Sequence, residues 1–237
     1  MVWSRSMLDA VLVPVAILII VAYHIFLLYK IRKDPLQTVI GINNIAKRAW
    51  VRSIMKDMDK KNILAVQTLR NSIMASTLMA STAILLTSGV AAFLSSNYSV
   101  KRPLESAVYG ARDDFSVAVK FLSLLACFLF SFLCYMQSIR FVNNVNYLIN
   151  VPPSYGSPLI TPEFVGDVLV RGFAFYSIGT RAFYVAFPLL LWIYGPIPVL
   201  LCSIALVPVL YHLDVSGDVV GAVRDVDEKP VNQQFMV

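Results

Sequence analysis

The stretch SIMASTLMASTAILLTSGVAAFL (72–94) contains no charged residue and is long enough to cross a lipid bilayer as a helix. Residues 10–29, 121–139 and 182–211 form three further stretches of this kind, and His24 is their only titratable side chain with a pKa near neutrality. A bilayer core about 30 Å thick needs roughly 20 apolar residues, and only a helix satisfies its own backbone within lipid. The sequence therefore predicts an all-α integral membrane protein with four transmembrane helices, at about residues 8–30, 71–95, 117–139 and 182–212.

The composition leaves little room for a separate soluble domain. The chain has 237 residues, 58% of them hydrophobic, and a formal net charge of +6. We expect one membrane domain over residues 1–213, followed by an acidic, flexible tail over residues 214–237.

Half of the basic residues lie between Lys30 and Asn71, that is, between two predicted spans. This position favours a role in topology and lipid contact over nucleic-acid binding. Between Ile42 and Met58 the apolar residues recur at helical spacing, which predicts a basic amphipathic helix that either lies on the cytosolic leaflet or packs on neighbouring subunits. The positive-inside rule then places both termini on the non-cytosolic side.

The fourth stretch is too long for one simple span, because thirty residues of straight helix would reach about 45 Å. Gly195-Pro196-Ile197-Pro198 interrupts it. We favour a single tilted, broken span over two half-helices that form a re-entrant hairpin, which would move the tail to the other side. A juxtamembrane helix is expected before it, over residues 163–177.

The second span carries small and hydroxylated residues at helical spacing. One face groups the candidates for lining a pore: Ser72, Ser76, Ala80, Ala83 and Thr87. Thr77, Ser81 and Ser88 share another face. Small residues let helices approach closely, and hydroxyls hydrogen-bond across the contact, so these faces serve either close packing or a wet path.

The third span carries a polar stripe that must avoid lipid, which runs through Asp113, Ser116, Lys120, Ser123, Cys127, Ser131, Cys134 and Ser138.

No constellation for catalysis or metal binding is apparent. The three cysteines, Cys127, Cys134 and Cys202, fall in predicted spans and are expected to be packing residues. His24 and His212 are the only histidines and lie in different spans. We therefore expect no enzyme activity, no cofactor and no metal site.

Four segments resemble a known family: TVIGINNIAKRAWV (38–51), LAVQTLRNSIMASTLMAST (64–82), KFLSLLACFLFSFLCYMQSIR (120–140) and GTRAFYVAFPLLLWIYGPIP (179–198). They are similar to a four-pass membrane family of land plants and bacteria that is catalogued as a domain of unknown function. The resemblance covers the chain up to about residue 213 and implies topology but little chemistry. A further likeness, to a small plant immune channel, implies a pentameric, calcium-permeable, cation-selective channel of the endoplasmic reticulum, with the plasma membrane as the other candidate location.

Two functions of different classes remain open. In a homo-oligomeric channel, Glu105, Asp113 and Asp114 would form rings that attract cations at the non-cytosolic mouth. Asp113 and Asp114 could instead favour the N-terminus of the third span through its dipole. The alternative is a non-conducting scaffold or adaptor that binds anionic lipid or a protein partner. The expected partners are copies of the chain itself, membrane lipids and permeating cations such as calcium, with no nucleic acid. A small-solute carrier is disfavoured because the spans show no internal repeat.

Overall fold

The computed structural model describes residues 5–99, 114–151 and 160–216. These residues form α1 (Arg5–Lys33), the 3-10 helix η1 (Pro35–Gln37), α2 (Val39–Lys56), α3 (Met58–Ser99), α4 (Asp114–Leu148), α5 (Pro162–Leu191) and α6 (Pro196–Asp214). No strand occurs within these ranges; the only β-type pairing there is an isolated bridge between Thr38 and Val215. The expectation of an all-α chain is confirmed.

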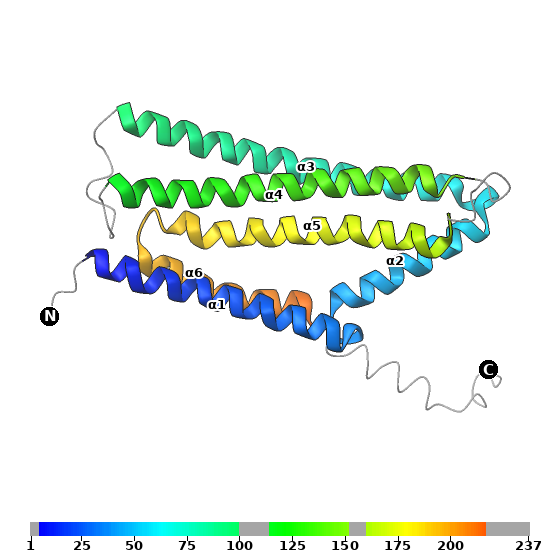
Figure 1. Cartoon of the computed structure of the whole chain (residues 1–237), viewed down its shortest axis with the longest axis horizontal. Coiled ribbons are helices and arrows are strands. Elements are labelled where there is room, and N and C mark those ends of the chain that lie inside the picture. The colour runs from blue at the N-terminus through cyan, green and yellow to red at the C-terminus, as the bar shows by residue number, and fades with distance from the viewer. Residues whose placement is uncertain (1–4, 100–113, 152–159, 217–237) are drawn as a thin grey trace, which may run out of the picture.

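Five of the helices are long and apolar enough to cross a membrane. Within the described residues these candidate spans are Met7–Lys33, Lys60–Ser95, Phe115–Leu148, Pro162–Leu191 and Pro196–Asp214. Figure 1 shows α3, α4 and α5 lying along one another, with α1 and α6 on the other side of α5 and α2 crossing one end of the bundle.

The fourth predicted span differs from expectation, because residues 182–212 belong to two helices that run in opposite directions. α5 ends at Leu191, and α6 starts at Pro196 and returns along α1 (Figure 1). Gly195 makes this reversal possible. Its φ of 155° lies in a backbone region that residues with a Cβ atom rarely adopt. Pro196 then supplies the fixed φ of a first helical residue. The favoured single broken span is therefore replaced by a helical hairpin.

Neither arm of this hairpin is a half-helix. α5 begins twenty residues before the predicted span, where the Thr161 hydroxyl accepts a hydrogen bond from the Phe164 N–H at 3.2 Å and Pro162 occupies the first turn. The juxtamembrane helix expected over residues 163–177 is thus the first half of α5.

The end of the bundle that contains α2, the start of α3 and α5, and the last turns of α4 is called the basic end here. A hydrophobic cluster fills it, made of Val51, Ile54, Ala65, Leu69, Val142, Val145, Ile149, Val165 and Leu169. α2 therefore buries its apolar face against helices of its own chain. The residues that follow α6 also meet this side of the molecule, because the Ser216 N–H donates to the Gln37 carbonyl at 3.0 Å.

Candidate functional site

Three polar side chains from three helices meet between α1, α5 and α6. The Tyr23 hydroxyl donates to Oδ2 of Asp214 at 2.5 Å, and a guanidinium Nη2 of Arg181 pairs with Oδ1 of the same carboxylate. The Asp214 side chain is 3% exposed and that of Arg181 is 18% exposed. These three residues are called the polar centre below.

The polar centre neutralises an unfavourable negative charge at the C-terminus of α6. Asp214 is the last residue of α6, and a negative charge at a helix C-terminus is unfavourable because the helix dipole is negative there. Arg181 supplies the opposite charge, and the Tyr23 hydroxyl binds the second carboxylate oxygen. Asp214 was expected to begin the flexible tail; it is instead a buried residue of the helix bundle.

An apolar cavity of about 370 Å³ lies beside the polar centre. α1, α5 and α6 line it, and Phe130 of α4 contributes to its wall. Arg181, His24 and Ser203 are its hydrogen-bonding side chains among otherwise apolar ones. The Ser203 hydroxyl donates to its own helix, at the Val199 carbonyl, with a distance of 2.9 Å.

Within the described residues, the polar stripe of the third predicted span is buried or half-buried, as expected for residues that must avoid lipid; Ser116, Ser123 and Cys127 are half-buried. Ser131, Cys134 and Ser138 of α4 are buried, and the Ser131 hydroxyl donates to the Gly179 carbonyl of α5 at 2.6 Å. A Cβ on Gly179 would lie 3.1 Å from that of Cys134, so glycine permits the close approach of the two helices here.

The predicted pore-lining face of α3 is mostly closed within the chain. Ser76, Ala80 and Ala83 are buried, while Ser72 and Thr87 are half-buried. α4 is the helix on which α3 packs along its length (Figure 1). Within the chain this face makes a close helix contact, because the small residues let α4 approach it.

The hydroxyls of α3 bond to the helix that carries them. Ser72, Ser76, Thr77, Thr82, Thr87 and Ser88 each donate to the carbonyl four residues earlier, at 2.9–3.0 Å. Each of these hydroxyls has a partner without a second helix, so the hydroxyl content of α3 does not by itself require a wet surface.

The predicted cation-attracting acids cannot be placed in the same way. Glu105 and Asp113 lie outside the described residues. Asp114 is the first residue of α4, and its side chain also lies outside the described part of the chain.

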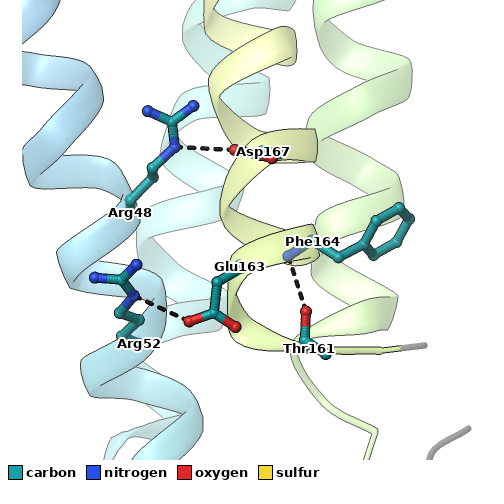
Figure 2. A network of polar contacts seen from close by, with 6 residues as sticks. All are labelled: Arg48, Arg52, Thr161, Glu163, Phe164 and Asp167. Atoms are coloured by element: carbon teal, nitrogen blue, oxygen red, sulfur yellow. Dashed lines mark hydrogen bonds and ion pairs between the residues drawn. The ribbon is translucent and has the colours of Figure 1, made fainter. Parts of the chain in front are cut away.

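Ion pairs join α2 to α5 at the basic end. Figure 2 shows Nε of Arg48 at 2.9 Å from Oδ1 of Asp167, and Nε of Arg52 at 3.3 Å from Oε1 of Glu163. All four side chains are roughly half exposed, so each pair contributes about 0–1 kcal/mol to stability. The pairs orient α2 on α5 more than they stabilise the fold.

Lys47 of α2 lies in a second cleft of about 240 Å³, between α2, α3 and α5. Its Nζ is 4.3 Å from the ring centroid of Phe173, and burial lowers the pKa of this ammonium group. Trp50, Asn43, Thr68 and Ser72 also line the cleft. This arrangement presents one cation among hydrogen-bonding and aromatic side chains.

The helices and the polar centre define the class of this molecule: a multi-pass α-helical membrane protein that holds charged side chains between its helices. Within that class, the chain belongs to the family described as "Protein of unknown function, DUF599", whose model matches residues 11–219. This confirms the resemblance carried by the four sequence segments. No curated protein and no solved structure matches the chain.

The polar centre was not identified from the sequence, although one signal pointed to it. Arg181 stands at the start of an apolar stretch, and charged residues in membrane helices almost always face a partner inside the bundle. Its partner could not be named, because Asp214 follows 33 residues later and Tyr23 precedes Asp214 by 191 residues.

Proposed function

We propose that the protein is a subunit of a homo-oligomeric, calcium-permeable cation channel of the endoplasmic reticulum. The resemblance to a plant immune channel supports calcium as the permeating ion, a pentamer as the assembly and immune signalling as the setting. One structural observation supports a symmetric assembly: within residues 5–99, 114–151 and 160–216, α3 leaves a mixed polar and apolar face with no helix packed against it.

That face runs along the apolar part of α3, opposite the contact with α4. Thr77, Ser81 and Ser88 are exposed on it, and Leu78 and Leu85 lie between them with exposed fractions of 68% and 71%. Their positions are separated by three or four residues, so they share one side of the helix. We call this set the open face of α3.

The open face suits a pore wall better than the opposite face of α3, which carries Ser76, Ala80 and Ala83 and packs on α4. The hydroxyls of Thr77 and Ser88 keep acceptor capacity after their bonds to the helix, so they can bind water or a partly hydrated cation. The leucines between the hydroxyls would face neighbouring copies of α3. In this arrangement Glu105, Asp113 and Asp114 stand close to the same mouth in sequence, between α3 and α4, and their carboxylates would raise the local cation concentration.

The test is single-channel recording on the purified protein in planar bilayers, combined with cysteine substitution. Thr77→Cys and Ser81→Cys on the open face should become sensitive to a charged thiol reagent that reduces the current. Ala80→Cys, at a buried position, is the matched control and should be insensitive. The native cysteines are first replaced with serine or alanine.

Discrete cation currents with this pattern of block support the proposal. If the oligomeric protein passes no current in bilayers of several compositions, the channel function is wrong. Currents that are blocked at neither open-face position would leave a channel but contradict α3 as its wall.

A second candidate function is a non-conducting scaffold that binds anionic lipid, and the Lys47 cleft favours it. Burial disfavours the charged form of Lys47, so an anionic ligand that neutralises this charge would bind favourably in the cleft. Asn43 and Trp50 add hydrogen-bonding groups. Co-sedimentation with vesicles that contain phosphatidylserine or a phosphoinositide tests it. Lys47→Gln should weaken binding more than Lys56→Gln, which removes the same charge from outside the cleft.

A further inference from the structure

The cavity beside the polar centre has the size and lining of a ligand site. Its volume of about 370 Å³ falls in the range of roughly 300–1,000 Å³ that is typical of small-molecule pockets. Ile25, Leu28 and Ile178 line it and are 62%, 56% and 46% exposed, so the cavity is bordered by side chains on the outer surface of candidate spans. An occupant would therefore enter from the lipid.

Two buried polar atoms at this cavity have no hydrogen-bond partner among the described residues. They are Nη1 of Arg181 and Nε2 of His24, and both residues line the cavity. A buried polar atom without a partner is unfavourable, so a ligand that binds both atoms would gain affinity from them.

The hydrogen-bonding roles of these two atoms are fixed by their surroundings. Nδ1 of His24 lies 2.7 Å from the Ile20 carbonyl, which can only accept, so Nδ1 carries the proton. In the neutral ring Nε2 is then an acceptor. Nη1 of Arg181 can only donate. Both atoms are almost fully covered by the protein, so an occupant of the cavity reaches this donor and this acceptor after a small shift of the two side chains.

The two atoms belong to the same level of the bundle. Tyr23, which precedes His24, shares the carboxylate of Asp214 with Arg181. The rings of Tyr23 and His24 stand edge to face, with centroids 5.6 Å apart. The Tyr23–Asp214 contact therefore links the part of α1 that carries His24 to Arg181 of α5.

We propose that this cavity binds a membrane lipid with an apolar body and a single hydroxyl group, a sterol being the chemical type that fits. The hydroxyl oxygen accepts from Nη1 of Arg181, and the hydroxyl hydrogen is donated to Nε2 of His24. A carboxylate or phosphate fits poorly, because it has no hydrogen for His24 and would approach the negative charge of Asp214. The site is independent of ion conduction.

A second apolar cavity, lined by residues of α3, α4 and the end of α5, has no buried polar atom without a partner in its lining. It measures about 440 Å³ and is lined by residues such as Leu86, Val90 and Phe121, and the single polar group in its lining is the hydroxyl of the half-exposed Tyr194. Nothing buried in it would orient a polar group. It serves as an internal reference for non-specific filling by lipid.

The experiment measures competition for a photoreactive sterol on the full-length protein in phosphatidylcholine nanodiscs. The competitors are cholesterol, its 3-methyl ether and its 3-keto counterpart, which share one apolar body, while only the first can both donate and accept. Cholesterol should compete at least about tenfold better than the other two, which corresponds to the loss of one hydrogen bond. His24→Phe keeps a ring but removes the acceptor, and should reduce the affinity for cholesterol about tenfold.

A second variant fills the cavity. Ala182→Phe should abolish labelling, whereas Leu122→Phe, on the exposed surface of α4 and outside the cavity, should leave it unchanged. Equal competition by cholesterol and its methyl ether overturns the proposal, as does full labelling of His24→Phe. Preferential displacement by oleate also overturns it, since a fatty acid would then be the favoured ligand. If Ala182→Phe fails to fold, His24→Phe decides the outcome alone.

Discussion

Lys120 of α4 and Asp9 of α1 form an ion pair inside the bundle, with Nζ 3.4 Å from Oδ2 and side chains only 4% and 9% exposed. The ammonium group also lies 5.7 Å from the ring centroid of Trp192, in the turn between α5 and α6. This contact lies at the end of the bundle opposite the basic end, and it ties α1 to α4. Lys120 belongs to the polar stripe of α4, so its burial agrees with the stripe facing inward.

Removing one partner of this pair should destabilise the protein strongly. Lys120→Met leaves the Asp9 carboxylate buried beside an apolar side chain, and such losses typically cost about 3–5 kcal/mol. Thermal unfolding in detergent should show a clear decrease for Lys120→Met and for Asp9→Leu. The double variant should recover part of the loss, because both charges of the pair are then removed from the interior. A double variant that is as unstable as the sum of the two single variants would show that the pair is not the source of the effect.

The polar centre should respond differently to changes at its hydroxyl and at its carboxylate. Tyr23→Phe removes one hydrogen bond to a charged group and should cost about 1.5–3 kcal/mol. Asp214→Ala leaves Arg181 buried without its counter-ion, so its cost should be greater. Chemical or thermal unfolding of both variants, with Tyr29→Phe at an exposed position as the control, measures the order. Equal stability of Tyr23→Phe and the unchanged protein would contradict the contact.

The close packing of α3 on α4 can be tested by enlarging a small residue. Ala83 is 0% exposed, so Ala83→Leu forces the helices apart and should cost roughly 1–3 kcal/mol. Ala75→Leu adds the same atoms on the exposed side of α3 and is the matched control. Loss of stability in the first variant only is the expected result from melting curves in detergent. Equal melting temperatures would mean that this face is not filled by α4.

The hairpin of α5 and α6 changes the expected topology of the C-terminus. α6 ends beside the start of α2, so the tail should lie on the cytosolic side with the basic end. A glycosylation acceptor appended after Val237 should remain unmodified in microsomes, while one inserted between Ser99 and Asp114 should be modified. Modification of the appended site would contradict the hairpin and restore an even number of spans.

The sequence was sufficient to predict the candidate spans of α1, α3 and α4, since these depend on the length and charge of each stretch alone. It was not sufficient to predict the path of the chain through residues 192–195. A glycine between apolar runs and followed by proline permits both a kinked continuation and a full reversal, and the choice depends on what α6 can pack against. α1 provides that surface, with Tyr23 and Leu27 against Leu210.

The contacts of the candidate site were also not predictable from the sequence, because they depend on how the helices pack. Spacing along α3 correctly grouped Ser76, Ala80 and Ala83 on one face, but periodicity does not show whether a face meets a helix or an open path. The contacts of Arg181 with Asp214 and of Lys120 with Asp9 join distant parts of the chain, and only the arrangement of the helices brings them together.

The small bridge between Thr38 and Val215 connects two regions that have been described separately. Thr38 caps α2 by accepting a hydrogen bond from the Gly41 N–H at 3.1 Å, and Val215 directly follows Asp214 of the polar centre. Gly41 packs so closely on Pro35 that an added Cβ would lie 2.1 Å from the Pro35 carbonyl oxygen. A larger residue at position 41 would therefore not fit without a shift of the backbone. Because Thr38 joins the start of α2 to the residue that follows Asp214, we expect a displacement of α2 to move the end of α6 and, with it, the polar centre.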